Sequence, residues 1–155
     1  MKKILIVLSL VAFIYSCSNN SSGNQQQTEK QPATDNANPP YDPERGAGKF
    51  TNVEVKPELD KVMAEAGIKV YDVKCASCHK LTDERLVGPG WKGVTSRYKP
   101  EWIMNFSTNP DEMLNIDPKA MAQLEICLVR MPNQALTDDD ARHVYEFMRK
   151  NDGVK

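Results

Sequence analysis

The residues Cys75-Ala76-Ser77-Cys78-His79 decide how this chain folds, because they form a C-x-x-C-H pattern. That pattern is typical of covalent attachment of a c-type haem. Two thiols at this spacing can meet the two vinyl groups along one edge of a porphyrin, and the next residue can place an imidazole under the iron. We therefore predict that Cys75 and Cys78 form thioethers and that His79 is the proximal iron ligand.

Two other interpretations of the motif have to be weighed. A thioredoxin-like redox pair needs alternating strands and helices around the cysteines, and no strand pattern lies nearby. A zinc site needs a fourth ligand beyond Cys75, Cys78 and His79, and the only other histidine of the chain is His143. Three matches at fixed spacing favour haem over both alternatives.

The N-terminus has the pattern of an export signal. Lys2 and Lys3 precede a mostly apolar run over residues 4–15, which is shorter than the roughly 20 residues that span a bilayer. The stretch Ile14-Tyr15-Ser16-Cys17 is similar to a bacterial lipobox, in which the cysteine is diacylated. We expect residues 1–16 to be a lipoprotein signal peptide and Cys17 to anchor an extracytoplasmic, periplasmic protein to a membrane. An ordinary secretory signal is the alternative.

Residues 17–57 are predicted to be a lipidated tether. Ser, Asn, Gln, Thr and Pro dominate up to Pro43, and such a stretch buries too little surface to offset the entropy cost of ordering it. From residue 41 the tether could be partly ordered, because Phe50, Val53 and Val55 suggest an extended piece lying on the domain. The domain itself is predicted to cover residues 58–155.

Helical patterns dominate the domain. Apolar residues recur at helical spacing over residues 58–74, namely Leu59, Val62, Met63, Ala66, Val70 and Val73. Gly67 lies within this predicted helix, where it costs about 1 kcal/mol relative to Ala. Close approach of another helix backbone would explain the glycine.

Further helices are predicted after the haem motif. Prolines at positions 100, 110 and 118 mark three short helix starts, the third running to about Arg130 with Met121, Leu124, Cys127 and Leu128 on one face. A final helix follows the cap Thr137, with Ala141, Val144, Tyr145 and Met148 on its apolar face. No strand pattern competes after residue 57, so we predict an all-α fold of four to five helices.

These residues together resemble a class I monohaem cytochrome c over roughly the last 90 residues. Gly67, Tyr71 and Cys75 follow each other at four-residue steps, which is similar to the N-terminal helix of that family. In that family the N-terminal helix crosses the C-terminal helix at this glycine. The matching residues of the C-terminal helix would be Val144, Phe147 and Met148. The resemblance implies a fold wrapped around one covalently bound haem.

The resemblance also implies how the iron is held. Gly88-Pro89 resembles the family's loop in which the proline carbonyl accepts the Nδ1–H of the proximal histidine. Met131-Pro132-Asn133 is similar to the distal segment, so Met131 would be the sixth iron ligand. Met113, Met121 and His143 are the competing candidates. If no methionine bound the iron, the protein would instead be an enzyme or gas sensor with an open iron site.

The charge distribution bears on haem and partner binding. Seven basic residues against three acidic ones lie between Lys69 and Lys99, and this excess predicts a cationic collar that steers an acidic partner. An ordinary solvated surface is the alternative. Candidates to bind the haem propionates are Trp91, Arg97, Tyr98 and Trp102, each of which could equally be a packing residue.

The predicted function is transfer of single electrons rather than catalysis, because no acid–base or nucleophile constellation stands out. A quinol-oxidising complex is the expected donor, and a terminal oxidase or nitrogen-oxide reductase the expected acceptor. We expect a monomer that binds no nucleic acid. Cys127 is left without a disulfide partner and is interpreted as a small buried hydrophobic residue.

Overall fold

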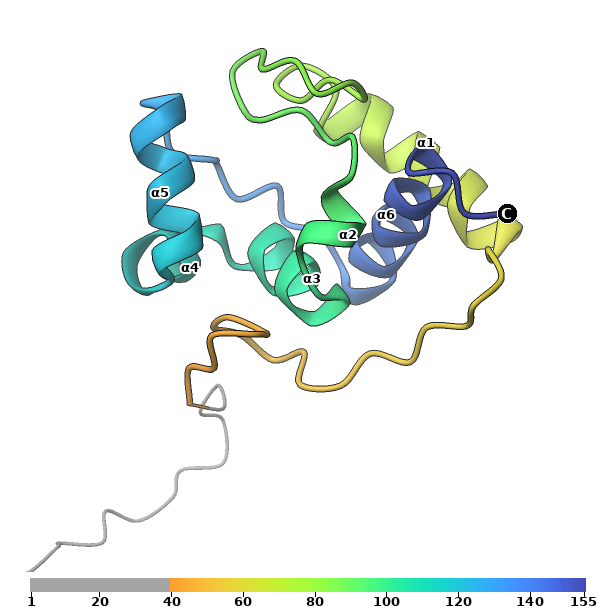
Figure 1. The fold of residues 1–155 in the computed structure, drawn as a ribbon, viewed down its shortest axis with the longest axis horizontal. Helices are drawn as coiled ribbons and strands as arrows, with labels where there is room; N and C mark the ends of the chain where they lie inside the picture. The colour runs from red at the N-terminus through yellow and green to blue at the C-terminus, as the bar shows by residue number, and fades with distance from the viewer. Residues whose placement is uncertain (1–39) are drawn as a thin grey trace, which may run out of the picture. The chain divides into compact units, whose positions relative to one another are not determined.

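The computed structural model describes residues 40–155, which contain six helices and two isolated β-bridges (Figure 1). The predicted signal peptide, Cys17 and most of the tether lie outside the described residues. The all-α prediction is confirmed. None of the helices within residues 40–155 has the length and hydrophobicity needed to cross a membrane. The helices are α1 (Lys61–Lys74), α2 (Val94–Arg97), α3 (Pro100–Thr108), α4 (Pro110–Ile116), α5 (Pro118–Cys127) and α6 (Asp138–Asn151).

The first and last helices pack closely at Gly67. A Cβ atom at this position would lie 2.1 Å from the backbone oxygen of His143 in α6, so only glycine permits this helix contact. In Figure 1, α6 lies next to α1 and the two helices cross. The close approach that the sequence predicts is therefore present, although it involves the backbone of His143 and the side chain of Phe147.

The apolar face of α1 differs from the predicted one. The buried residues are Ala64, Gly67 and Tyr71, whereas Val62 and Val73 are 81% and 83% exposed. The reason is the small distance between the two helices, which places small residues and one aromatic ring in the contact. The predicted apolar face of α1 is therefore wrong at Val62 and Val73, whereas Val70 does pack against the core.

Helix α6 follows its prediction closely. Thr137 and Asp140 form a reciprocal capping box, with Asp140 N–H donating to Thr137 Oγ1 at 3.1 Å and Thr137 N–H donating to Asp140 Oδ2 at 3.2 Å. Its predicted apolar residues are all buried, and Phe147 is buried as well. This helix thus provides the surface on which α1 and the N-terminal segment pack.

The short helices between the haem motif and α6 differ in part from their predictions. Asp117 caps α5 by accepting from Ala120 N–H at 2.9 Å, as its position before Pro118 predicts. Helix α5 ends at Cys127 rather than near Arg130, because Leu128 adopts a left-handed conformation with φ of 60°. Met121 and Leu128 are exposed, so the predicted apolar face of this helix is wrong at both residues. Four-residue α2 was not predicted and raises the helix count above the expected four to five.

The segment 41–58 packs along the helices, so the folded unit begins well before residue 58. We call residues 41–58 the strap. Its first half is fixed by Asn105, which is fully buried. The side-chain amide of Asn105 donates to the carbonyl oxygens of Arg45 and Phe50, both at 2.9 Å, and accepts from Phe50 N–H at 2.9 Å. The core is contacted by Phe50, Val53 and Val55, as predicted for an extended piece that lies on the domain.

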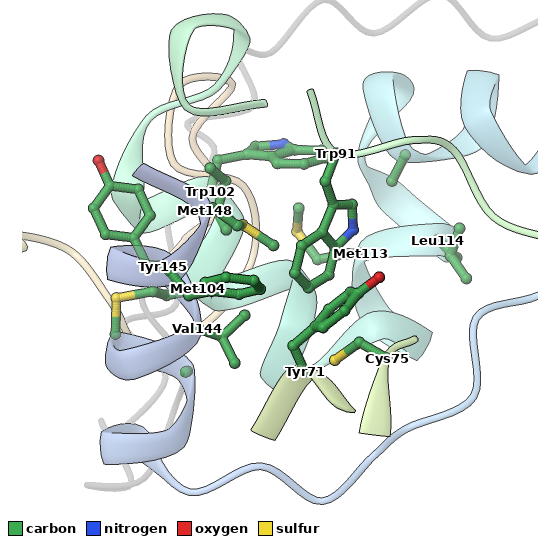
Figure 2. Packing of buried hydrophobic residues seen from close by; sticks show 14 of the residues in the cluster. Tyr71, Cys75, Trp91, Trp102, Met104, Met113, Leu114, Val144, Tyr145 and Met148 are labelled. Atoms are coloured by element: carbon green, nitrogen blue, oxygen red, sulfur yellow. The ribbon is translucent and has the colours of Figure 1, made fainter. Parts of the chain in front are cut away.

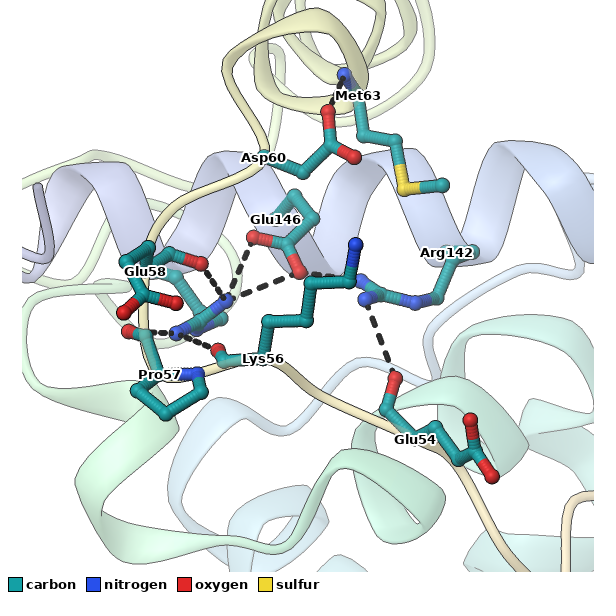
Figure 3. A network of polar contacts seen from close by, with 9 residues as sticks. Glu54, Lys56, Pro57, Glu58, Asp60, Met63, Arg142 and Glu146 are labelled. Atoms are coloured by element: carbon teal, nitrogen blue, oxygen red, sulfur yellow. Dashed lines mark hydrogen bonds and ion pairs between the residues drawn. The ribbon is translucent and has the colours of Figure 1, made fainter.

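A buried ion-pair cluster on α6 fixes the second half of the strap (Figure 3). Glu146 is 1% exposed and is contacted by Arg149 Nη1 at 2.9 Å and Arg142 Nη1 at 2.6 Å. Arg149 Nη2 also donates to the carbonyl oxygens of Lys56 and Pro57, at 2.8 and 2.9 Å. The charge of Arg149 is thus balanced by Glu146, and its remaining donors satisfy strap carbonyls that face the protein.

Substitution of Gly67 tests the helix contact. Helix propensity alone predicts that Gly67→Ala raises stability by up to about 1 kcal/mol. We expect the opposite, a loss of about 1–3 kcal/mol in the free energy of unfolding, because the new Cβ clashes with backbone rather than with a movable side chain. Chemical denaturation measures the change. Lys69→Ala, at an exposed position of the same helix, is the control and should leave stability nearly unchanged.

Substitution of Asn105 tests whether the strap is part of the fold. Asn105→Ala leaves the buried strap groups without their partners, and we expect it to destabilise the protein by about 2–3 kcal/mol. Limited proteolysis should then cut within residues 41–57 much faster than in the parent protein. The exposed strap residue Asn52 provides the control Asn52→Ala. Equal cleavage rates in all three proteins would contradict the proposed role of Asn105.

Candidate haem site

The C-x-x-C-H segment leaves α1 as a compact turn. Cys75 caps the C-terminus of α1, and its carbonyl accepts from the N–H groups of Cys78 and His79 at 3.0 and 2.9 Å. The carbonyl of Cys78 in turn accepts from Gly88 N–H at 2.9 Å. The motif and the following loop are therefore held together by backbone hydrogen bonds, which orient all three side chains of the motif.

The imidazole of His79 is held from two sides. Its Nδ1 lies 2.9 Å from the carbonyl oxygen of Pro89, which is the contact expected from the sequence. Tyr71 Oη donates to the backbone carbonyl of His79 at 2.7 Å, and the Trp91 ring centroid is 5.6 Å from the imidazole. Because the Pro89 carbonyl can only accept, Nδ1 carries the proton and the Nε2 lone pair is left for a metal.

Burial sets the protonation states of these groups. Desolvation lowers the pKa of His79, and the hydrogen bond to Pro89 opposes this effect only partly. The imidazole is therefore neutral at neutral pH, which is the state that binds a metal. Desolvation also raises the pKa of the Cys75 thiol to about 11. Cys75 is consequently a thiol rather than a thiolate before haem attachment.

Two cavities of about 270 Å³ each adjoin the motif. Cys75 lines the first cavity and Cys78 lines the second. Figure 2 shows Cys75 beside Tyr71 and Trp91 in the buried apolar cluster. Residues that line both cavities are His79, Pro89, Phe106, Gln123 and Met131. The cavities therefore meet at the two residues predicted to bind the iron.

The residues present fit a covalently bound haem. The two motif thiols are free and divide between the two cavities, as attachment along one porphyrin edge requires. The walls are largely apolar and aromatic, which suits a flat macrocycle. A Cβ atom at Gly88 would lie 2.4 Å from Cε1 of His79, so the glycine leaves room for the imidazole in this position.

The other sulfur and imidazole candidates lie elsewhere. Met113 is fully buried beneath the strap, and its Sδ accepts from Ala47 N–H at 3.1 Å. Met121 and His143 line neither cavity. The geometry therefore favours Met131 over all three competitors.

The four predicted propionate contacts all line the first cavity, but they do not offer the same donors. The indole N–H of Trp102 donates to Asp117 Oδ2 at 3.1 Å, so Trp102 contributes ring surface to the cavity wall, which agrees with its alternative role as a packing residue. Arg97 uses one Nη1–H on the carbonyl of Lys92, at 2.7 Å, and Tyr98 Oη accepts from Gln123 at 2.7 Å. Arg97, Tyr98 and Trp91 keep the capacity to donate into the cavity.

Gln123 is the wall residue that sequence reasoning missed. It lines both cavities and donates from Nε2 to Tyr98 Oη. No motif marks a glutamine in the middle of a short helix, and its neighbours Met121 and Leu124 look more suitable as wall residues. Its role follows only from the way α5 packs beside the loop that carries Tyr98.

The family model described as cytochrome c matches residues 64–152. A solved cytochrome c from Rhodothermus marinus is 30% identical, with a TM-score of 0.65, and the match covers 68% of this chain and 90% of that chain. An engineered form of that protein has the same values, and the engineered form bound to a carbene intermediate has a TM-score of 0.63. No curated protein sequence matches.

The close contact between Gly88 and His79 generates a prediction. Gly88→Ala should displace the imidazole and weaken its bond to the iron, because the added Cβ overlaps the ring. We expect a shifted Soret band and a measurable high-spin fraction in the oxidised protein. Gly153, where an added Cβ meets nothing within 4 Å, supplies the control Gly153→Asn, since Asn tolerates its positive φ. An unchanged spectrum for Gly88→Ala would contradict the close contact between Gly88 and the His79 ring.

Proposed function

Since the chain belongs to the cytochrome c family, whose members bind haem c covalently, we propose that it is an exported carrier of single electrons with His79 and Met131 as axial iron ligands. The observation that carries this proposal is that both residues line both cavities, while each motif cysteine lines one. Cys75 and Cys78 would hold a porphyrin covalently, and His79 and Met131 would bind its iron.

Each residue has a defined task in this proposal. Cys75 and Cys78 hold the porphyrin covalently, and the Pro89 carbonyl keeps the proton of His79 on Nδ1. The haem supplies an iron atom that gains or loses one electron. A methionine thioether stabilises the ferrous state and raises the reduction potential, and it also occupies the position that oxygen or peroxide would need.

The surrounding residues limit movement and water access during electron transfer. Tyr71, Trp91 and Phe147 form a continuous set of ring contacts, with centroids 5.0 and 5.3 Å apart. Tyr98 and Trp102 stack at 4.1 Å on the wall of the first cavity. Such close packing allows little rearrangement when the charge of the iron changes.

The location and partners belong to the same proposal. The charged and apolar N-terminal pattern and the lipobox-like stretch support export and diacylation of Cys17. A protein tethered to a membrane in this way would meet membrane-bound redox complexes. We propose a quinol-oxidising complex as donor and a terminal oxidase or nitrogen-oxide reductase as acceptor.

Replacement of Met131 tests the ligand set. In Met131→Ala we expect loss of the sulfur-to-iron charge-transfer band, a lower reduction potential and rapid binding of carbon monoxide to the reduced protein. Met121→Ala, which changes a methionine outside both cavities, is the matched control and should retain the parent spectrum and potential. Rapid carbon monoxide binding by the unaltered protein would contradict the proposal and favour an open iron site.

Lipidation has a separate test. The intact protein expressed in a bacterial host should fractionate with membranes and carry the mass of a diacylated Cys17. Cys17→Ala removes the acceptor thiol, so that acyl mass should be absent. An unmodified cysteine, or cleavage at another position, would indicate an ordinary secretory signal.

A further inference from the structure

Helix α5 presents a half-buried glutamine to both cavities beside the haem motif. Gln123 lines the first and the second cavity, and its Nε2 donates to Tyr98 Oη at 2.7 Å. Apolar side chains such as Phe106 and Met131 line the same two cavities, and a polar group among them is costly unless it is hydrogen-bonded. The contact with Tyr98 therefore gives a physical reason for a glutamine in this wall.

The ring of Tyr98 is held in a fixed plane. It stacks on Trp102 with ring centroids 4.1 Å apart and an interplanar angle of 14°. Trp102 is itself held, because its indole N–H donates to the buried carboxylate of Asp117 at 3.1 Å and its ring meets that of Phe106 at 5.1 Å. Asp117 caps the start of α5, and Gln123 lies within the same helix. Helix α5 thus holds the stacked pair by a polar contact to each ring.

The hydrogen bond from Gln123 limits where the hydroxyl proton of Tyr98 can point. A phenol oxygen carries one proton, which rotates about the C–O bond, and it can accept at the same time. Because Gln123 Nε2 donates to this oxygen, the phenol proton has to point away from the amide nitrogen. Within residues 40–155, the hydrogen bond of the Tyr98 hydroxyl is this one, in which it accepts. The proton is thereby left for an acceptor in the first cavity, which Tyr98 lines.

We propose that Gln123 is a positioning residue for electron transfer, which keeps the Tyr98 proton directed at the haem and thereby raises the reduction potential. This inference rests on the proposed electron-transfer function. The anionic groups of a haem are its two propionates, and a phenol that donates to one of them reduces the negative charge felt by the iron. Less negative charge near the iron favours the ferrous state over the ferric state. Gln123 acts on this balance through Tyr98.

A double-mutant cycle in the haem-loaded protein tests the inference. Spectroelectrochemistry measures the reduction potential of the parent, of Tyr98→Phe, of Gln123→Leu and of the variant with both changes. At a fixed applied potential, we expect Tyr98→Phe to raise the ratio of oxidised to reduced protein about twofold to fivefold, which is part of the strength of one hydrogen bond. Gln123→Leu should change the ratio in the same direction, and it should add nothing in the Tyr98→Phe background.

A second variant reverses the hydrogen bond with little change of shape. In Gln123→Glu the ionised carboxylate can only accept, so the Tyr98 proton is drawn out of the cavity toward residue 123. We expect a lower reduction potential than in Gln123→Leu. The new negative charge also lowers the potential, and the same substitution in the Tyr98→Phe background measures that effect alone. The difference between the two backgrounds is therefore due to the proton.

Ultraviolet resonance Raman spectra provide a readout that does not depend on the iron. Tyrosine bands differ between a phenol that accepts a hydrogen bond and one that only donates, and subtraction of the spectrum of the matching Tyr98→Phe variant isolates the Tyr98 signal. Tyr98 should accept and donate in the parent and lose its acceptor signature in Gln123→Leu. Met121→Leu, at an exposed position of the same helix that lines neither cavity, is the control and should match the parent in spectrum and potential.

Several results would overturn the inference. A higher potential in Gln123→Leu would show that the amide oxygen of Gln123 accepts the Tyr98 proton instead. An unchanged potential in either single variant, or an equal shift by Gln123→Leu in both backgrounds, would exclude an action through Tyr98. An unchanged Tyr98 Raman signal in Gln123→Leu would exclude the contact itself. Each of these results leaves the electron-transfer proposal standing, whereas the absence of a reversible redox couple in the parent would overturn both.

Discussion

The contact between α1 and α6 at Gly67 is the constraint on which the rest of this structure depends. With no Cβ at this position, the two helices approach until the backbone oxygen of His143 occupies the space that a side chain would fill. The C-terminus of α1 is thereby held in place, and Cys75 caps that terminus. The orientation of the haem-binding motif thus follows from a helix contact eight residues earlier in the chain.

The strap extends the folded unit beyond the helices. Buried side chains hold it at three places: Asp117, which Tyr41 reaches with its hydroxyl at 3.3 Å; Asn105; and Arg149. Asn105 and Arg149 belong to α3 and α6, and Asp117 caps the start of α5. Residues that look like the end of a linker in the sequence are therefore a structural part of the protein.

In the proposed site, a rigid proximal side holds His79, and an extended segment would supply Met131 on the distal side. His79 is fixed by Pro89 and Tyr71 within one loop and one helix. Met131 lies between α5 and α6, in a segment that begins after Leu128 and contains Ala135, another residue with positive φ at 49°. If Met131 binds the iron as proposed, both sides of the haem would have to be held, and the capped start of α6 follows this segment directly.

The sequence alone determined the chemistry of this protein, because the chemistry is local. The spacing of Cys75, Cys78 and His79 specifies haem attachment, and caps such as Thr137 and Asp117 set helix starts through contacts within a few residues. Gly67 and Pro89 were also identified from short patterns. These features need no knowledge of distant packing.

Burial and hydrogen bonding that involve residues far along the chain became known only from the tertiary structure. In the fold, Ala64 is buried and Val62 is exposed. The indole N–H of Trp102 donates to Asp117, and Gln123 lies in the cavity wall. The fold also packs the polar-looking strap against buried amide and charged groups. In each case the partner lies far along the chain or on another helix, and burial or hydrogen bonding with such a partner is a property of the packed fold rather than of any short stretch of sequence.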